Sequence, residues 1–198
     1  VNKRLLALAG QQSEDMRSTL LEAGVRIISG HGRLEGPGAV VISTDAGGTD
    51  FDRVEADTLV VSVGASPREL DSALPDGERI LTWTQLYDMK ALPEHLIVVG
   101  SGVTGAEFAG AYMNLGAKVT LVSSRDQVLP GEDQDAAAVI QKVFTRGGMT
   151  VLSKSRADKV ERVGDSVLVT LSDGRTAAGS PCLTAVGSIP NTAGTGPG

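Results

Sequence analysis

The spacing of apolar residues changes along the chain and predicts several kinds of element. Apolar positions at helical spacing predict a helix over residues 3–21, which ends at Gly24. Shorter alternating runs then predict a β-meander, with strands at 25–28, 33–34, 39–43 and 52–55. Residues 58–63 are almost wholly apolar, as a strand buried on both faces requires. The N-terminal part is therefore expected to form a helix, a meander and a central strand.

The pattern from residue 96 onward is typical of a parallel sheet covered by helices. An apolar run at 96–99, a glycine turn and a helix ending at Gly116 lead to a second apolar run at 118–122. An amphipathic helix is predicted at 132–146, with Val139 and Val143 on its inward face. Further strands are predicted at 149–152, 159–163, 166–171, 175–177 and 181–186. This order of elements indicates an α/β fold that combines a parallel sheet with an antiparallel β-meander.

A stretch rich in turn-forming residues separates the two patterns. Residues 68–79 include Pro75, Asp76 and Gly77 and are expected to connect one domain to the next, with the boundary near residue 74. The chain is thus predicted to consist of a domain at 1–74, a second domain at 75–191 and a flexible glycine-rich tail at 192–198.

The turn after residue 99 carries the strongest chemical signal, G-x-G-x-x-G. Gly100 allows a tight exit from the strand, Gly102 lets the backbone approach a pyrophosphate, and Gly105 lets the helix lie close to the sheet. Val103 and Thr104 begin the helix, whose N-terminus offers free N–H groups and partial positive charge to phosphates. A purely structural turn is the alternative, but the strand before it and the helix after it favour a Rossmann-like NAD(P)-binding domain.

The end of the second strand is expected to select the nucleotide. An Asp or Glu at this place binds the ribose 2′-OH in NAD-selective proteins. Here Ser123, Ser124 and Arg125 occupy it, and hydroxyls and a guanidinium can bind a 2′-phosphate. NADP(H) is therefore expected to be preferred over NAD(H), unless Arg125 simply points to water.

Composition narrows the class of protein. With 41% hydrophobic residues the chain can build a core, and the net charge of −6, with scattered carboxylates, gives no reason to expect a nucleic-acid partner or membrane insertion. The lone Cys182 excludes an internal disulfide, and the N-terminus shows no signal-peptide pattern, so a cytoplasmic location is expected. His31 and His95 lack partners at ligand spacing, so no metal site is predicted.

Three motifs in one order resemble the pyridine nucleotide-disulfide oxidoreductase family of two-dinucleotide flavoproteins. Residues 62–67 are similar to the A-T-G-x-x-P turn that touches FAD, 100–107 to the NAD(P)H turn G-x-G-x-x-G-x-E, and 185–191 to the G-x-x-P-N return to the flavin domain. Residues 122–137 resemble the actinobacterial NAD(P)H quinone reductases of this family. Together the motifs cover nearly the whole chain.

The resemblance implies roles for further residues. Glu107 matches a glutamate near the nicotinamide and flavin, and this role is favoured over the alternative of a favourable charge at the helix start. Val103 stands where glutathione reductases carry a tyrosine gate. The resemblance also implies cofactor contacts at Val63, Gly64, Val186, Gly187 and Gly32, the last of which a plain turn explains almost as well.

The resemblance further implies hydride transfer from NAD(P)H to FAD and then to a small-molecule acceptor such as a quinone, in a homodimeric parent. A dihydrolipoyl dehydrogenase-type disulfide reductase is one alternative, and a nucleotide-binding fragment without activity of its own is another. The family's N-terminal G-x-G-x-x-G, its cysteine pair, the flavin-side lysine and the dimerisation domain have no counterpart here. Residues 1–74 are accordingly expected to be the second half of an FAD-binding domain, and the chain a middle fragment.

Overall fold

The computed structural model describes residues 2–43 and 51–196, which fall into two compact units. One unit comprises Val1–Ser66 with Pro190–Gly198, and the other comprises Pro67–Ile189. The chain passes between the units twice, and these two passages, β4 (Ala65–Pro67) and β13 (Ser188–Pro190), form a two-stranded sheet. The end of the expected tail, residues 197 and 198, lies outside the described residues.

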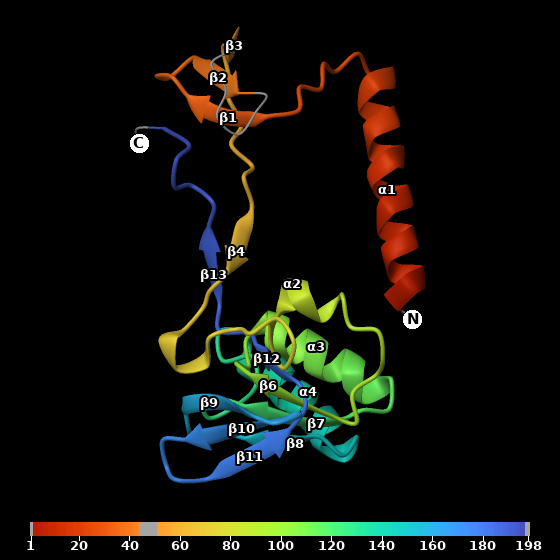
Figure 1. Cartoon of the computed structure of the whole chain (residues 1–198), viewed down its shortest axis with the longest axis vertical. Coiled ribbons are helices and arrows are strands. Elements are labelled where there is room, and N and C mark those ends of the chain that lie inside the picture. The colour runs from red at the N-terminus through yellow and green to blue at the C-terminus, as the bar shows by residue number, and fades with distance from the viewer. Residues whose placement is uncertain (1, 44–50, 197–198) are drawn as a thin grey trace. The chain divides into compact units, whose positions relative to one another are not determined.

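The first unit contains the predicted helix and meander. Helix α1 spans Asn2–Glu22, and β1 (His31–Leu34), β2 (Ala39–Ser43) and β3 (Phe51–Glu55) form an antiparallel sheet in the order β1-β2-β3 (Figure 1). Each strand pairs with its neighbour in sequence, for example Gly32 with Ile42. The predicted strand at 25–28 has no regular secondary structure and pairs with no strand that the structure describes.

The prediction of a central strand at residues 58–63 is wrong for this structure. The segment is not part of a sheet, and Val60 is 85% exposed. An apolar run can be a buried strand only when neighbouring strands and a covering layer are present, and the described residues supply neither. Helix α1 is likewise exposed along its length, including its leucines.

The second unit is built on a five-stranded parallel sheet. Its order is β5-β12-β6-β7-β8, formed by β5 (Ile80–Thr82), β12 (Cys182–Thr184), β6 (His95–Val99), β7 (Lys118–Val122) and β8 (Thr150–Leu152). The connections include α2 (Trp83–Leu86), α3 (Val103–Asn114) and α4 (Gln134–Arg146). The predicted strand, turn, helix and strand from residue 96 to 122 are confirmed.

Alternation along β6 divides the core between the two faces of the sheet. Leu96 and Val98 pack with residues of α3, whereas Ile97 and Val99 pack against a second sheet. That sheet is antiparallel, in the order β11-β10-β9, and consists of β9 (Ala157–Val163), β10 (Ser166–Leu171) and β11 (Thr176–Gly179). The parallel sheet is therefore buried on both faces, which explains its nearly continuous apolar strands.

The second unit begins earlier in the chain than the sequence predicts, at Pro67. A short 3₁₀ helix, Asp71–Ala73, contacts β9, and Ala73 is buried in the same cluster as Ile97. The expected boundary near residue 74 therefore lies inside the second unit, because this helix belongs to its core.

Helix α4 packs less closely than its pattern predicts. Val139 and Val143 are 61% and 55% exposed, contrary to the inward position expected for them, and Ala137 is the buried residue of this helix.

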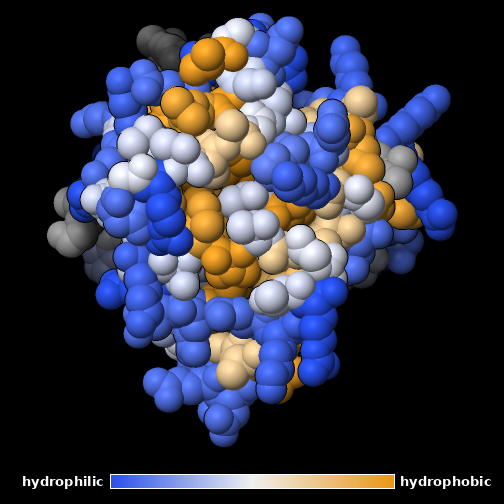
Figure 2. Space-filling model, turned by 90° about the horizontal axis from the view of Figure 1, so that it is seen from below, coloured by the Kyte–Doolittle hydropathy of each residue, from blue (hydrophilic) through white to orange (hydrophobic). Residues whose placement is uncertain are grey.

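On the face seen in Figure 2, apolar residues gather in patches interrupted by hydrophilic side chains. None of the helices that the structure describes combines the length and apolar character needed to cross a membrane.

Candidate functional site

The glycine turn lies between β6 and α3, at the carboxyl end of the parallel sheet. Gly100 donates its N–H to the carbonyl of Val122 at 3.0 Å, so the turn is joined to the end of β7. Ala106 donates to the carbonyl of Gly102 at 2.9 Å, which starts the helix. Ligands of open α/β sheets bind at the carboxyl ends of the strands, and the turn is in that place.

Different physical requirements explain why each of the three turn positions is a glycine. Gly100 has a φ of +110°, and a Cβ there would overlap the carbonyl oxygen of Ala185. A Cβ on Gly105 would overlap the carbonyl oxygen of Gly100. Gly102 differs, since no described atom lies within 4 Å of where its Cβ would stand, and its φ of −68° suits any residue. The fold requires the first and third glycines, whereas the second keeps a space open.

The open space beside Gly102 adjoins unused hydrogen-bond donors. The first N–H groups of an α-helix, here those of Val103, Thr104 and Gly105, have no carbonyl partner within the helix. Gly102 occupies the N-cap position and has no side chain to cap them. Donors at a helix N-terminus with room for an anion fit a pyrophosphate.

A pair of buried hydroxyls joins the turn to the loop after β7. The Oγ atoms of Ser101 and Ser123 lie 2.7 Å apart, and both side chains are buried. Ser123 Oγ also accepts a hydrogen bond from the N–H of Arg125 at 3.1 Å. The hydroxyl of Ser123 was expected to face a 2′-phosphate, but it is turned inward and holds the loop in shape.

The next two residues of that loop are available to a ligand. Ser124 and Arg125 are exposed. No carboxylate in residues 2–43 and 51–196 forms an ion pair with the Arg125 guanidinium. The sequence analysis did not single out Ser101, because the G-x-G-x-x-G motif places no requirement on that position. The only signals that pointed to it were its hydroxyl between two glycines and a second serine, Ser123, at the end of the next strand.

Val103 and Glu107 lie one helical turn apart on α3 and line a common groove. The groove has a volume of about 450 Å³ and continues along α4, where Val143 and Phe144 contribute to it. Val103 is 49% exposed and Glu107 is also exposed, so both side chains are accessible.

The residues expected to contact FAD come from both ends of the chain. Within the first unit, Asn191 donates its Nδ2–H to the carbonyl of Val63 at 3.1 Å and its backbone N–H to the carbonyl of Gly64 at 3.0 Å. Asn191 Oδ1 accepts a hydrogen bond from Ser66 at 2.7 Å. The amide of Asn191 thus brings the first and third motifs together, although the sequence signal gave it no particular role.

The other expected FAD contacts are more dispersed. Gly187 has a φ of +108°, and its carbonyl accepts a hydrogen bond from the N–H of Arg68 at 3.0 Å. Val186 is half-buried and packs against the core of the second unit. Gly32 is exposed in β1, where a Cβ would meet, among the described residues, only the side chain of Val40 at 3.4 Å, so packing sets at most a mild requirement for glycine there.

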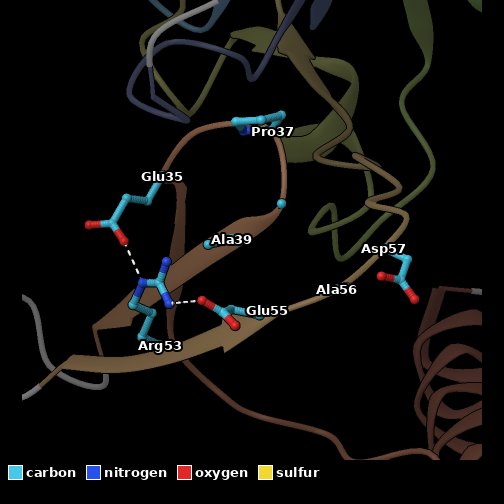
Figure 3. Close-up of a pocket in the computed structure, with 8 residues that line it drawn as sticks. Glu35, Pro37, Ala39, Arg53, Glu55, Ala56 and Asp57 are labelled. Atoms are coloured by element: carbon cyan, nitrogen blue, oxygen red, sulfur yellow. Dashed lines mark hydrogen bonds and ion pairs between the residues drawn. The ribbon is translucent and has the colours of Figure 1, made fainter.

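A cavity of about 520 Å³ in the first unit contains none of the predicted site residues. Figure 3 shows Arg53 between the carboxylates of Glu35 and Glu55, with Asp57 apart from this group. Hydrogen bonds from Arg53 lower the pKa of Glu55, and with Glu35 and Asp57 also in the lining the carboxylates outnumber the one guanidinium. Among the described residues, no group of histidine, cysteine and carboxylate side chains is placed to hold a metal ion.

The chain is similar to known proteins along nearly its whole length. The model of the family described as pyridine nucleotide-disulphide oxidoreductase matches residues 4–196. A Mycobacterium tuberculosis protein named NAD(P)H dehydrogenase (quinone) is 52% identical over 99% of this chain and 41% of its own length. A glutathione reductase from Nostoc sp. is 32% identical over 90% of this chain and 38% of its own length.

The crystal structure of LpdA from Mycobacterium tuberculosis has a TM-score of 0.88 and 50% sequence identity, over 98% of this chain and 43% of the other. The chain therefore spans about two-fifths of the length of these relatives. The match runs through both units, and it confirms the α/β fold and the resemblance carried by the three motifs. This chain belongs to the pyridine nucleotide-disulphide oxidoreductase family.

Proposed function

We propose that the second unit binds NAD(P)H at its glycine turn, and that the chain is the NAD(P)H-binding portion of an FAD-dependent oxidoreductase. The contrast among the three glycines carries this proposal. Packing explains Gly100 and Gly105, but it gives no reason for Gly102. The absence of a side chain on Gly102 leaves an open space beside free N–H groups. A bound pyrophosphate requires such a space.

The residues of the second unit would divide the work of binding. The N–H groups of Val103, Thr104 and Gly105 would hold the pyrophosphate, while Ser124 and Arg125 would face the adenosine ribose. The exposed guanidinium of Arg125 supports a preference for NADP(H), with NAD(H) tolerated.

The nicotinamide end would extend toward the start of α3. Val103 is smaller than the tyrosine that glutathione reductases carry at this place, so it leaves room for the nicotinamide ring to pass. Glu107 lies one turn further along α3 on an accessible face, where its carboxylate can orient that ring. The redox chemistry would come from FAD bound to the parent protein, which would accept a hydride from NAD(P)H and pass the electrons to an acceptor.

The first unit supports the second part of the proposal. Val60, Val61 and the leucines of α1 are exposed, and Val63 and Gly64 are held beside Asn191. Surfaces of this kind are expected where another layer of a protein packs. We assign the first unit, in place of the expected residues 1–74, to the second half of an FAD-binding domain, whose remaining part would cover these surfaces and complete the flavin site.

Two candidate acceptors follow from different relatives. A quinone is favoured because the relatives at 52% identity are named NAD(P)H dehydrogenase (quinone). A disulfide substrate of the dihydrolipoyl dehydrogenase type is the second candidate, since a Zymomonas mobilis enzyme of that name is 32% identical over 75% of this chain.

Flavin content and reductase activity test this division of labour. The 198-residue chain should bind NADPH but purify without a stoichiometric flavin absorbance band, and it should not reduce a quinone or a dye. A longer protein that contains this chain together with the rest of the flavin domain should do both. Quinone reduction by the 198-residue chain alone would contradict the proposal that flavin chemistry needs further residues.

A further inference from the structure

The loop after β8 lies directly beside the loop that carries Arg125. Lys154 donates its backbone N–H to the carbonyl of Arg125 at 3.0 Å. The next residue, Ser155, donates to the carbonyl of Ser123 at 3.1 Å. Since β7 and β8 are adjacent and parallel, both loops leave the same carboxyl edge of the sheet. The backbones of Arg125 and Lys154 are therefore joined by one hydrogen bond, although the two residues follow different strands.

The backbone of Lys154 is in a conformation that a lysine rarely adopts. Its φ is +61°, in the left-handed region. Hydrogen bonds hold both sides of it, because the carbonyl of Ser153 accepts from Arg175 at 2.9 Å and the Ser155 hydroxyl lies 3.1 Å from that of Ser172. A conformation that sterics disfavour and the surroundings maintain often marks a functional position.

The side chain of Lys154 is only loosely engaged. Its Nζ lies 3.8 Å from Asp126 Oδ2, and the two side chains are 70% and 83% exposed. Exposed ion pairs at such a distance contribute little to stability, so the ammonium can change partners at small cost. Arg125, Asp126 and Lys154 together carry one net positive charge at the place where the ribose would lie.

We propose that Lys154 is a second cation of the 2′-phosphate site, acting with Arg125, and that Asp126 weakens this site by competing for Lys154. The inference rests on the proposed function, since it places the adenosine ribose of NADPH beside the end of β7. A phosphate monoester carries close to two negative charges at neutral pH, so a second cation would favour NADPH over NADH. The sequence alone shows a single basic residue at this site, because Lys154 follows a different strand.

Affinities of NADPH and NADH, measured by calorimetry on the full chain, test the proposal. Lys154→Ala should weaken NADPH binding by roughly three- to tenfold, as expected for one partly exposed charge contact, and leave NADH binding nearly unchanged. Lys154→Arg should keep the preference for NADPH. Asp126→Asn should strengthen NADPH binding by about two- to threefold, because it removes the competing charge.

Lys118→Ala provides a matched control. Lys118 is an exposed lysine at the start of β7, on the opposite edge of the sheet, so its loss should not alter the ratio of the two affinities. If Lys154→Ala weakens both nucleotides equally or neither, the inference is overturned while the proposed function stands. If the unmodified chain binds neither nucleotide, the proposed function fails and the inference fails with it.

Discussion

Substituting the glycines of the turn one at a time should separate the needs of the fold from those of the ligand. Gly100→Ala would force a Cβ into the carbonyl of Ala185 at a φ of +110°. Overpacking typically costs about 1–3 kcal/mol, and a disfavoured positive φ about 1–2 kcal/mol, so the loss should be roughly 2–5 kcal/mol. Gly105→Ala should lose about 1–3 kcal/mol through its overlap with the Gly100 carbonyl.

Gly102→Val should behave in the opposite way. The position has an extended φ of −68° and open space, so the stability should fall by no more than about 1 kcal/mol, mainly from a poorer N-cap. The valine methyl groups would occupy the room that a pyrophosphate needs, and NADPH affinity should fall by at least about tenfold.

Thermal denaturation and calorimetric titration measure the two effects separately. For a chain of this length, 1 kcal/mol corresponds to about 2–4 °C in Tm, so Gly100→Ala should lower the Tm by roughly 4–20 °C. Gly10→Val, on the exposed helix α1 where a Cβ also meets nothing within 4 Å, is the control and should change neither quantity greatly. Unchanged NADPH affinity in Gly102→Val would refute the assignment of this turn as the pyrophosphate site.

Two further predictions concern the structure around the site. Ser123→Ala should lower the free energy of unfolding by about 1–3 kcal/mol in urea titrations, because the Ser101 hydroxyl and the Arg125 N–H would lose a buried partner; an unchanged urea midpoint would argue against the hydroxyl bridge. Hydrogen bonds from the side chain and then the backbone of Arg175 lower the pKa of Asp173 from 3.8 to about 2. The stabilisation from Asp173 is therefore present above its ordinary pKa and lost as the pH falls from about 4 to about 2. Asp173→Asn should be less stable than the unmodified chain at pH 7 and equally stable near pH 2, and stability curves that stay parallel over this range would contradict the pairing.

Local signals in the sequence were sufficient for the stretch of the second unit from β6 to β7. The apolar run of β6, the glycine turn and the helix start lie next to one another, and the sheet that buries them is contained in the same unit. Cys182 is buried in β12, within the strand predicted at 181–186, and burial raises the pKa of its thiol to about 12. These elements could be predicted because pattern and packing partners are both present.

Elsewhere the residue types were recognised correctly, but the residues that they contact were absent from the described chain or distant in the sequence. Residues 58–63 are apolar enough for a central strand, yet the described chain offers them no neighbouring strand. The residue types at 123–125 indicated hydroxyls and a guanidinium, but only the structure shows that Ser123 turns inward. Lys154 could not be found from spacing, because its proximity to Arg125 arises from the pairing of β8 with β7.

A crystal structure of the chain with NADP⁺ would show directly where the nucleotide binds. We expect the pyrophosphate within hydrogen-bond distance of the N–H groups of Val103 and Thr104, beside Gly102, and the ribose beside Ser124 and Arg125. The second unit has another cavity of about 490 Å³ at the amino edge of its sheet, lined by residues such as Arg79 and Lys90. Nucleotide bound in that cavity, or density absent from the glycine turn at saturating NADP⁺, would contradict the assignment of the glycine turn as the NADP(H) site.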